Sequence, residues 1–193
     1  MRLNEIERGD TLRHRALIRM ISRFSGMRLP DAARVAFYHH DFAGPTLGEW
    51  TQKTMRGPST WSVSERELMA ACVARWNSCP FCVGAHGAIA VRGLDRSVVQ
   101  KTLDDYATAP ISGRLKAALA FIEKMNREPD ELTAADVEMA RQAGVDSDAL
   151  RDAAAVAAVF NVITRYANAL DFSIPTETEF DKAARMLLRR GYS

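Results

Sequence analysis

The sequence lacks the features that mark secreted, membrane-spanning or nucleic-acid-binding proteins. Its 193 residues include only three cysteines, an odd number, which excludes the disulfide framework of small secreted domains. The longest uninterrupted apolar run, residues 153–160, is far shorter than the roughly 20 residues that a membrane-spanning helix needs. With 26 Lys and Arg against 24 Asp and Glu, the formal net charge is +2, so no strongly basic surface for nucleic acid is expected.

The composition is that of a globular chain with a single core. An apolar fraction of 47% excludes a disordered chain, and the length suits one domain over residues 1–193. Residues 1–5 contain no apolar segment, so we expect no signal peptide and a cytoplasmic location. In that compartment the three cysteines would be free thiols, metal ligands or redox catalysts.

Helix signals occur along the whole sequence, and no run of alternating β-branched residues indicates a strand. The pattern Ser64 to Glu67 is typical of a capping box, as is Thr176 to Glu179. We therefore predict an all-α fold of about nine or ten helices. They are expected at residues 11–24, 30–40, 45–56, 64–76, 79–92, 95–105, 112–127, 133–143, 148–170 and 176–190.

The helix predicted at residues 148–170 is apolar on nearly all sides, as a buried central helix would be. Asn161, Arg165 and Asn168 form one polar stripe on it, which favours solvent or a subunit contact over a pocket. A shift of 84 residues superimposes several alanines of residues 70–85 on residues 154–169. This is a weak signal of a possible internal pseudo-repeat.

The segment from Asn77 to His86 contains the side chains that are best suited to catalysis. Cys79 and Cys82 form a Cys-x-x-Cys pair at a predicted helix start, which places the two sulfurs within one turn of each other. The unpaired backbone N–H groups and the dipole at a helix start favour a thiolate. His86 follows Cys82 by four residues, on the same face, where it could act as a base or stabilise a thiolate.

A carboxylate can complete this group. If Asn77 and Ser78 form a tight turn, the two flanking helices make a hairpin, and Glu67 returns to the level of His86. Carboxylate, imidazole and thiol in line would make a proton relay. The simpler interpretation of Glu67 is the capping box alone.

Other interpretations of these residues stay open. Cys79, Cys82 and His86 could ligate structural zinc, with Glu67 or one of His39 and His40 as the fourth ligand, although no second ligand pair exists. We favour redox chemistry over zinc and expect no metal or organic cofactor. Cys72 lies within an apolar run and is interpreted as core filler.

Glu67, eleven intervening residues, Cys79-Pro80-Phe81-Cys82, three more and His86 resemble the core motif of the alkyl hydroperoxidase D-like group. That group belongs to the carboxymuconolactone decarboxylase superfamily of all-helical proteins. Residues 55–59 and 64–67 are similar to its peroxidase-related branch, and residues 160–170 resemble that branch's closing helix. The resemblance covers a core of about residues 29–170, which leaves the N-terminal helix and the helix at residues 176–190 peripheral.

The resemblance implies a peroxidase of the alkylhydroperoxide reductase type. In that scheme Cys82 attacks an organic hydroperoxide, Cys79 resolves the sulfenic acid to a Cys79–Cys82 disulfide, and His86 with Glu67 relays protons. It also implies homo-oligomers, commonly trimers or hexamers, and a dithiol reductant or peroxiredoxin partner. Alternatives are a disulfide oxidoreductase without a peroxide substrate and a decarboxylase-type lyase, for which Arg165 would be a pocket residue. Phe81 stands where well-known members have His, which bears on peroxide efficiency.

Overall fold

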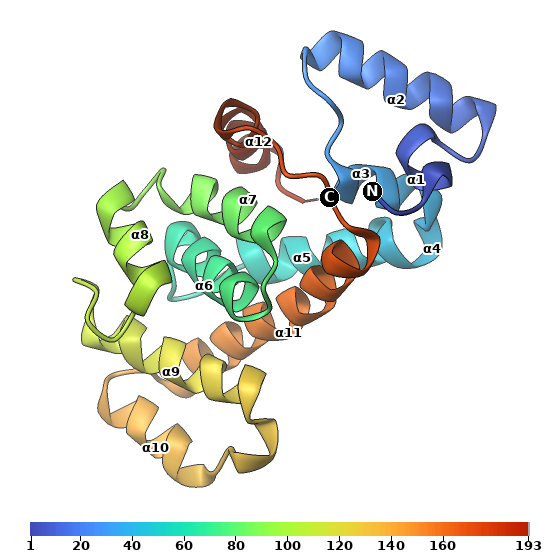
Figure 1. Cartoon of the computed structure of the whole chain (residues 1–193). Helices are drawn as coiled ribbons and strands as arrows, with labels where there is room; N and C mark the ends of the chain where they lie inside the picture. Colours follow the sequence, from blue (N-terminus) through green and yellow to red (C-terminus); the bar gives the residue numbers. More distant parts are fainter. Residues whose placement is uncertain (193) are drawn as a thin grey trace.

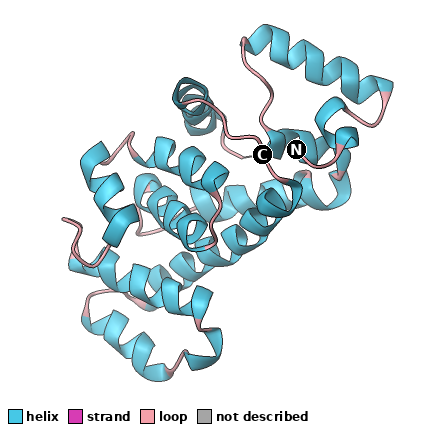
Figure 2. Ribbon diagram, viewed as in Figure 1, coloured by secondary structure: helices cyan, strands magenta, loops and turns pink. Residues whose placement is uncertain are grey.

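Helices make up the regular structure of the described chain (Figure 2). The computed structural model describes residues 1–192, apart from the side chains of His40 and Phe42. No strand occurs within these residues, which confirms the all-α prediction. The elements are α1 (Asn4–Arg8), α2 (Leu12–Ser25), α3 (Asp31–Tyr38), α4 (His40–Ala43), α5 (Pro45–Arg56), α6 (Val63–Trp76), α7 (Pro80–Ala90), α8 (Arg96–Asp105), α9 (Gly113–Arg127), the 3₁₀ turn η1 (Pro129–Glu131), α10 (Ala134–Gln142), α11 (Ser147–Leu170) and α12 (Glu177–Arg190).

Each of the ten predicted helices is present within a few residues of its expected bounds. The short helices α1 and α4 were not predicted, because five and four residues are too few to show a helical period. The capping box of α6 is also not where we placed it. Ser62 is the N-cap and pairs with Glu65, so the prediction of Ser64 with Glu67 is wrong. The helix begins early enough to leave Glu67 free for another contact.

The core lies around α11, which crosses the molecule and packs against α5, α6 and α9 (Figure 1). Its buried face consists of small and apolar side chains such as Ala153, Val156 and Phe160, which are fully buried. By length and composition alone α11 could cross a membrane. In the structure it packs against α5, α6 and α9, so its central position agrees with the sequence prediction, but only 39% of its most apolar stretch is buried.

Two close contacts set the position of the last helix. α6 and α7 form an antiparallel hairpin, and α12 packs on the outer side of α7. A Cβ at Gly84 would lie only 2.4 Å from the ring of Phe180, so α12 can approach α7 this closely because position 84 has no side chain. The absence of a side chain at Gly84 thus leaves room for the Phe180 ring of α12 against α7.

The N-terminal helices lie at one end of α11, and α2 extends away from the rest of the molecule (Figure 1). Leu12 and Phe24 of α2 are 82% and 84% exposed. The remainder of this region is packed inward, where Ile6 and Val35 join a second apolar cluster that contains Cys79 and Cys82. The N-terminal helices therefore cover the cysteine pair.

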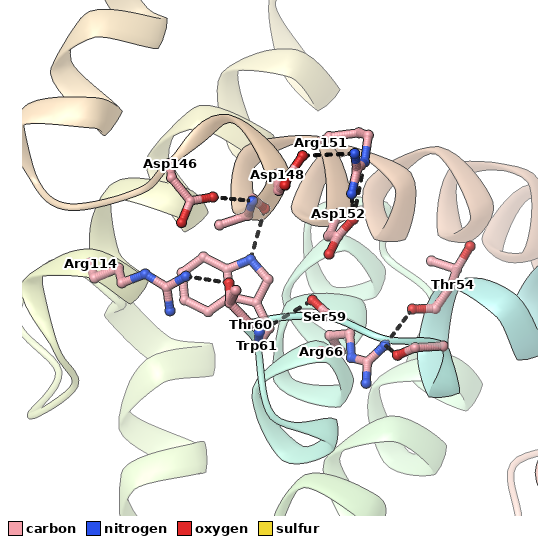
Figure 3. A network of polar contacts seen from close by, with 12 residues as sticks. Thr54, Ser59, Thr60, Trp61, Arg66, Arg114, Asp146, Asp148, Arg151 and Asp152 are labelled. Atoms are coloured by element: carbon pink, nitrogen blue, oxygen red, sulfur yellow. Dashed lines mark hydrogen bonds and ion pairs between the residues drawn. The ribbon is translucent and has the colours of Figure 1, made fainter.

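A polar network anchors the loop between α5 and α6 to α11 (Figure 3). The Trp61 indole N–H donates to the carbonyl oxygen of Ala149 at 2.8 Å, and the Arg114 guanidinium lies 3.8 Å above the indole. Arg66 donates from one Nη1 to the carbonyl oxygens of Thr54 and Gly57, both at 2.9 Å. These bonds fix the start of α6 and hence the direction in which its side chains point.

Candidate active site

The turn between α6 and α7 has the tight geometry that the relay hypothesis requires. Ser78 adopts a left-handed conformation with φ of 52°, and its N–H donates to the carbonyl oxygen of Arg75. The Cys79 N–H then donates to the carbonyl oxygen of Ala74 at 2.9 Å. The chain therefore reverses within two residues, and α7 runs back along α6 as predicted.

Cys79 and Cys82 lie at the start of α7 and are both 1% exposed. The Cys82 thiol donates a hydrogen bond to the Cys79 sulfur, and the backbone N–H groups of Cys82 and Phe81 also donate to it. These bonds lower the pKa of Cys79 to about 7 in spite of burial. The same thiol–thiol bond, together with burial, raises the pKa of Cys82 above its usual value. In the reduced pair, Cys79 is the better thiolate and Cys82 retains its proton.

Glu67 and His86 are in direct contact, as the predicted hairpin requires. Glu67 Oε2 lies 2.6 Å from His86 Nδ1, and Glu67 is fully buried while His86 is 6% exposed. A carboxylate can only accept, so Nδ1 carries the proton and Nε2 is left as the basic nitrogen. The ring of Phe160 packs edge-on against the imidazole, with the ring centroids 4.4 Å apart. His86 is thus held one turn beyond Cys82 with a defined tautomer.

Two further residues complete the environment of Glu67. Arg56 Nη1 lies 2.7 Å from Glu67 Oε1, and the Tyr192 hydroxyl donates to the same oxygen at 2.8 Å. The Arg56 guanidinium also lies 4.8 Å above the Tyr192 ring. Neither residue was predicted to act here, although Arg56 stands in the segment that carried the family resemblance. No sequence signal marks Tyr192, because its role depends on where the C-terminal residues fold.

The charges around Glu67 keep it ionised. Burial alone would raise the pKa of this carboxyl, but the charge of His86, the hydrogen bond from it and the charge of Arg56 outweigh burial. The net effect lowers the Glu67 pKa below its usual value. Burial and the Glu67 charge together raise the pKa of Tyr192 well above its usual value, so the phenol stays protonated and donates.

The side chain of Phe81 points into an aromatic cluster. Its ring meets Phe172 edge-on at 5.2 Å between centroids and Phe180 at 6.2 Å. Phe172 follows α11, and Phe180 lies on α12. The position before Cys82 therefore packs the C-terminal part of the chain against α7 and offers no polar group to the thiol.

The polar stripe of α11 contacts the turn before Cys79. Asn161 Oδ1 accepts from the Asn77 side chain at 3.1 Å, and the Asn168 amide donates to the Asn77 carbonyl oxygen at 2.8 Å. Arg165 is exposed, and its Nη1 donates to the carbonyl oxygen and to the side-chain oxygen of Asn161. Asn77 and Asn161 are the residues related by the shift of 84, and α6 and α11 begin at Val63 and Ser147, the same distance apart. The pseudo-repeat itself stays a prediction.

The other candidate residues lie elsewhere. Cys72 is buried in the main core, where burial raises its pKa to about 12, so the core-filler interpretation is confirmed. His39 Nδ1 lies 2.7 Å from the Tyr166 hydroxyl, and the His40 side chain lies outside the described part. Among the described side chains, which do not include that of His40, no three His, Cys, Asp or Glu are arranged to hold a metal ion.

Two of the surface clefts formed by the described residues lie away from this site. The larger, of about 630 Å³, is lined in part by Glu65, Leu94 and Ile111, and the smaller, of about 350 Å³, by Cys72, Tyr106 and Glu123. Neither is lined by a residue of the cysteine pair or the relay. The candidate site is therefore a buried cluster of reactive groups and not part of either cleft.

Solved structures with the same fold include peroxidase-related proteins. A protein of Ralstonia eutropha JMP134, described as an alkylhydroperoxidase AhpD core, aligns with TM-score 0.75 and 25% identity over 90% of each chain. A peroxidase-related protein of Silicibacter sp. TM1040 aligns with TM-score 0.77 and 25% identity over 93% of each chain. The debrominase Bmp8 in complex with 2,3,4-tribromopyrrole shares the fold at TM-score 0.69 and 20% identity, over 94% of this chain and 92% of its own. No family model and no curated protein matches the sequence.

Proposed function

We propose that this AhpD-like protein is a thiol-dependent peroxidase that reduces organic hydroperoxides through a Cys79–Cys82 redox pair. The observation that carries the proposal is the 2.6 Å contact between Glu67 and His86, one turn beyond the pair. Buried acid–base partners beside a thiol are what peroxide cleavage needs, since the departing alkoxide must be protonated. The peroxidase-related neighbours support the same assignment.

The two thiols take different parts in the reaction. Cys82, whose pKa is raised, gives its proton to His86 Nε2 and attacks the outer peroxide oxygen as a thiolate. The O–O bond breaks, the alkoxide takes the proton from His86 and leaves as an alcohol, and Cys82 becomes a sulfenic acid. The Cys79 thiolate then attacks the Cys82 sulfur and displaces hydroxide, which takes up the proton that Cys79 gave up on ionising and leaves as water, so a disulfide remains. Two electrons from a dithiol reductant return both thiols.

The lowered pKa of Cys79 suits exchange with that reductant. A thiolate with a pKa of about 7 is both a good nucleophile and a good leaving group in thiol–disulfide exchange. This observation also favours a second candidate function, a disulfide oxidoreductase with no peroxide substrate. A dithiol carrier or peroxiredoxin partner, a trimeric or hexameric assembly and a cytoplasmic location complete the proposal.

Peptide-mapped alkylation tests the proposal. Reduced protein receives one equivalent of cumene hydroperoxide and is then quenched with a thiol-alkylating reagent in denaturant. We expect rapid loss of labelling at Cys79 and Cys82, with Cys72 still labelled as the internal control. If both stay labelled after peroxide and lose labelling only after a disulfide reagent, the oxidoreductase replaces the peroxidase.

Two variants, each with one cysteine of the pair replaced, identify the thiol that attacks the peroxide. Cys79→Ser should accumulate a sulfenic acid on Cys82 that a dimedone-type probe traps, because no resolving thiol is left. Cys82→Ser should show no trapped sulfenic acid at one equivalent of peroxide. The reverse pattern would transfer the attacking role to Cys79.

A further inference from the structure

The last residues of the described chain are fixed against α5. After α12 the chain turns at Gly191, whose φ of +77° lies in the region that favours glycine. A Cβ at this position would lie 2.2 Å from Gln52 Oε1. The next residue, Tyr192, donates its backbone N–H to that same Gln52 oxygen at 2.8 Å. The tail formed by Gly191 and Tyr192 therefore has one defined path over α5.

That path places the Tyr192 side chain on the relay. Its hydroxyl lies 2.8 Å from Glu67 Oε1 and 3.4 Å from His86 Nδ1. Its ring stacks on the imidazole of His86, with centroids 6.3 Å apart and planes inclined by 26°. A surface tyrosine would not need these contacts, which join the end of the chain to buried groups on α6 and α7.

We propose that Tyr192 is a positioning residue of the relay, which holds the Glu67 carboxylate for His86 and sets the pH range in which His86 accepts a proton. The inference rests on the proposed function, since it assigns a role within the same site. It adds a residue far along the sequence from the motif and makes the C-terminal tail part of the site.

The physical basis is the set of donors and positive charges around the carboxylate. Glu67 Oε1 accepts from the Tyr192 hydroxyl and forms an ion pair with Arg56, and Oε2 accepts from His86. Each donor makes the carboxylate less basic, so it draws less on the proton that His86 Nδ1 shares with it. The loss of the phenol would leave a more basic carboxylate, which stabilises the imidazolium more strongly. His86 would then hold its proton to higher pH and serve as a base over a narrower range.

Other charged groups near the pair come from three helices. Arg56 of α5 contacts Glu67 directly, Arg66 of α6 is its neighbour in sequence, and Asp152 of α11 interacts with Arg66. Arginine stays charged over the working pH range, so Arg56 and Arg66 supply a constant field. The titrating members are Glu67, His86 and the cysteines, and Tyr192 is the phenol that touches the first two.

The test replaces the hydroxyl and keeps the ring. In Tyr192→Phe we expect the titration midpoint of His86, followed through its imidazole Cε1–H signal in NMR spectra and assigned with His86→Gln, to rise by about 0.5 to 1 pH unit. The acid limb of the peroxidase pH–rate profile should move by the same amount. The matched control is Tyr106→Phe, which removes a 2.7 Å phenol–carboxylate bond to Glu123 outside the site and should leave the midpoint unchanged.

A second variant separates the hydroxyl from its placement. Gly191→Ala keeps the tyrosine but adds a Cβ against Gln52, so the tail is displaced and the His86 midpoint should rise as in Tyr192→Phe. If Gly191→Ala shifts the midpoint and Tyr192→Phe does not, the tail acts only as a cover and the proposal is overturned. An unchanged midpoint in both variants also overturns it.

The NMR titration needs no peroxide, so the two proposals fail separately. A shifted midpoint in a protein that turns over no hydroperoxide would leave Tyr192 as the positioning residue and remove the peroxidase function. Normal hydroperoxide turnover with an unshifted His86 midpoint would keep the peroxidase function and remove the positioning role of Tyr192. Circular dichroism at pH 7 confirms for each variant that the helices are intact before either result is interpreted.

Discussion

Arg66 and Glu67 are adjacent on α6, and each is the centre of a buried polar network of a different kind. Arg66 donates to the backbone carbonyl oxygens of Thr54, in the last turn of α5, and of Gly57, which follows that helix, next to the Trp61 bond to α11 (Figure 3). Glu67 contacts the side chains of Arg56, His86 and Tyr192. One network joins a permanent cation to backbone groups that do not titrate, and the other surrounds Glu67 and His86, which can gain and lose protons.

The difference shows how one helix turn can serve both stability and chemistry. The Arg66 network fixes where α6 begins, and α6 in turn fixes the direction of Glu67. Bonds to backbone carbonyls are unaffected by pH in the range where proteins fold, so they can hold the titrating network steady. We expect changes in the Arg66 network to lower the free energy of unfolding, and changes in the Glu67 network to lower the rate of peroxide turnover.

The largest expected effect is on the rate, in Glu67→Gln. The amide would turn its NH2 to His86 Nδ1, which forces the imidazole into the tautomer with a protonated Nε2 that cannot act as a base. Peroxide turnover should fall about 100-fold, in the range typical for loss of general acid–base catalysis. The control is Glu123→Gln, which changes a carboxylate bonded to Tyr106 and should retain wild-type turnover. Equal losses in both variants would contradict the comparison.

The next effect is on stability, in Arg66→Met. The apolar side chain fills similar space but leaves the carbonyl oxygens of Thr54 and Gly57 without their donor. Urea denaturation should show a loss of about 3 kcal/mol, since each buried acceptor left unpaired costs on the order of 1 to 3 kcal/mol. Turnover by the remaining folded protein should stay within a factor of about three. A loss of turnover as large as that of Glu67→Gln would mean that the two networks are one.

A smaller stability effect is expected in Trp61→Phe. The substitution removes the indole N–H that bonds to Ala149 and part of a side chain that is only 1% exposed. The expected loss is about 2 kcal/mol, measured by the same denaturation. Trp50→Phe is the control, because Trp50 is 43% exposed and its loss should cost less than about 0.5 kcal/mol.

The smallest expected effect is on how the free energy of unfolding depends on pH in acid. The folded state lowers the pKa of Glu67 below its usual value of 4.5, so this group contributes stability above that pH. The contribution is lost as the pH falls through the lower, folded pKa. Between pH 6 and acid, the wild type and Arg66→Met should lose stability with the same dependence on pH. Glu67→Gln should show a shallower dependence by at most about one bound proton. Parallel curves for all three proteins would exclude Glu67 as the source.

The sequence predicts the fold and the centre of the site better than it predicts the surroundings. Cys79, Cys82 and His86 are close together on one helix, so their spacing alone places them. The contact of Glu67 with His86 also follows from the sequence, because a two-residue turn at Asn77 and Ser78 leaves the hairpin little freedom. The catalytic roles of these four residues stay a prediction.

What the sequence could not supply depends on contacts between distant segments. Two overlapping patterns, Ser62 with Glu65 and Ser64 with Glu67, satisfy the same capping rule, and only the packed loop before α6 selects the first. Arg56 and Tyr192 both contact Glu67, although Arg56 lies 11 residues before it in the sequence and Tyr192 lies 125 residues after it. No local pattern reports such distances.

The close approach of Phe180 to Gly84 has a consequence for how related sequences vary. A side chain at this position would displace the Phe180 ring, and we expect the displacement to pass to α12 and to the tail that brings Tyr192 to Glu67. Gly84 on one side, and the adjacent Gly191 and Tyr192 on the other, are therefore expected to evolve together. In related chains we expect lineages to keep or lose them together, and a lineage that has lost them would need another donor for the buried carboxylate.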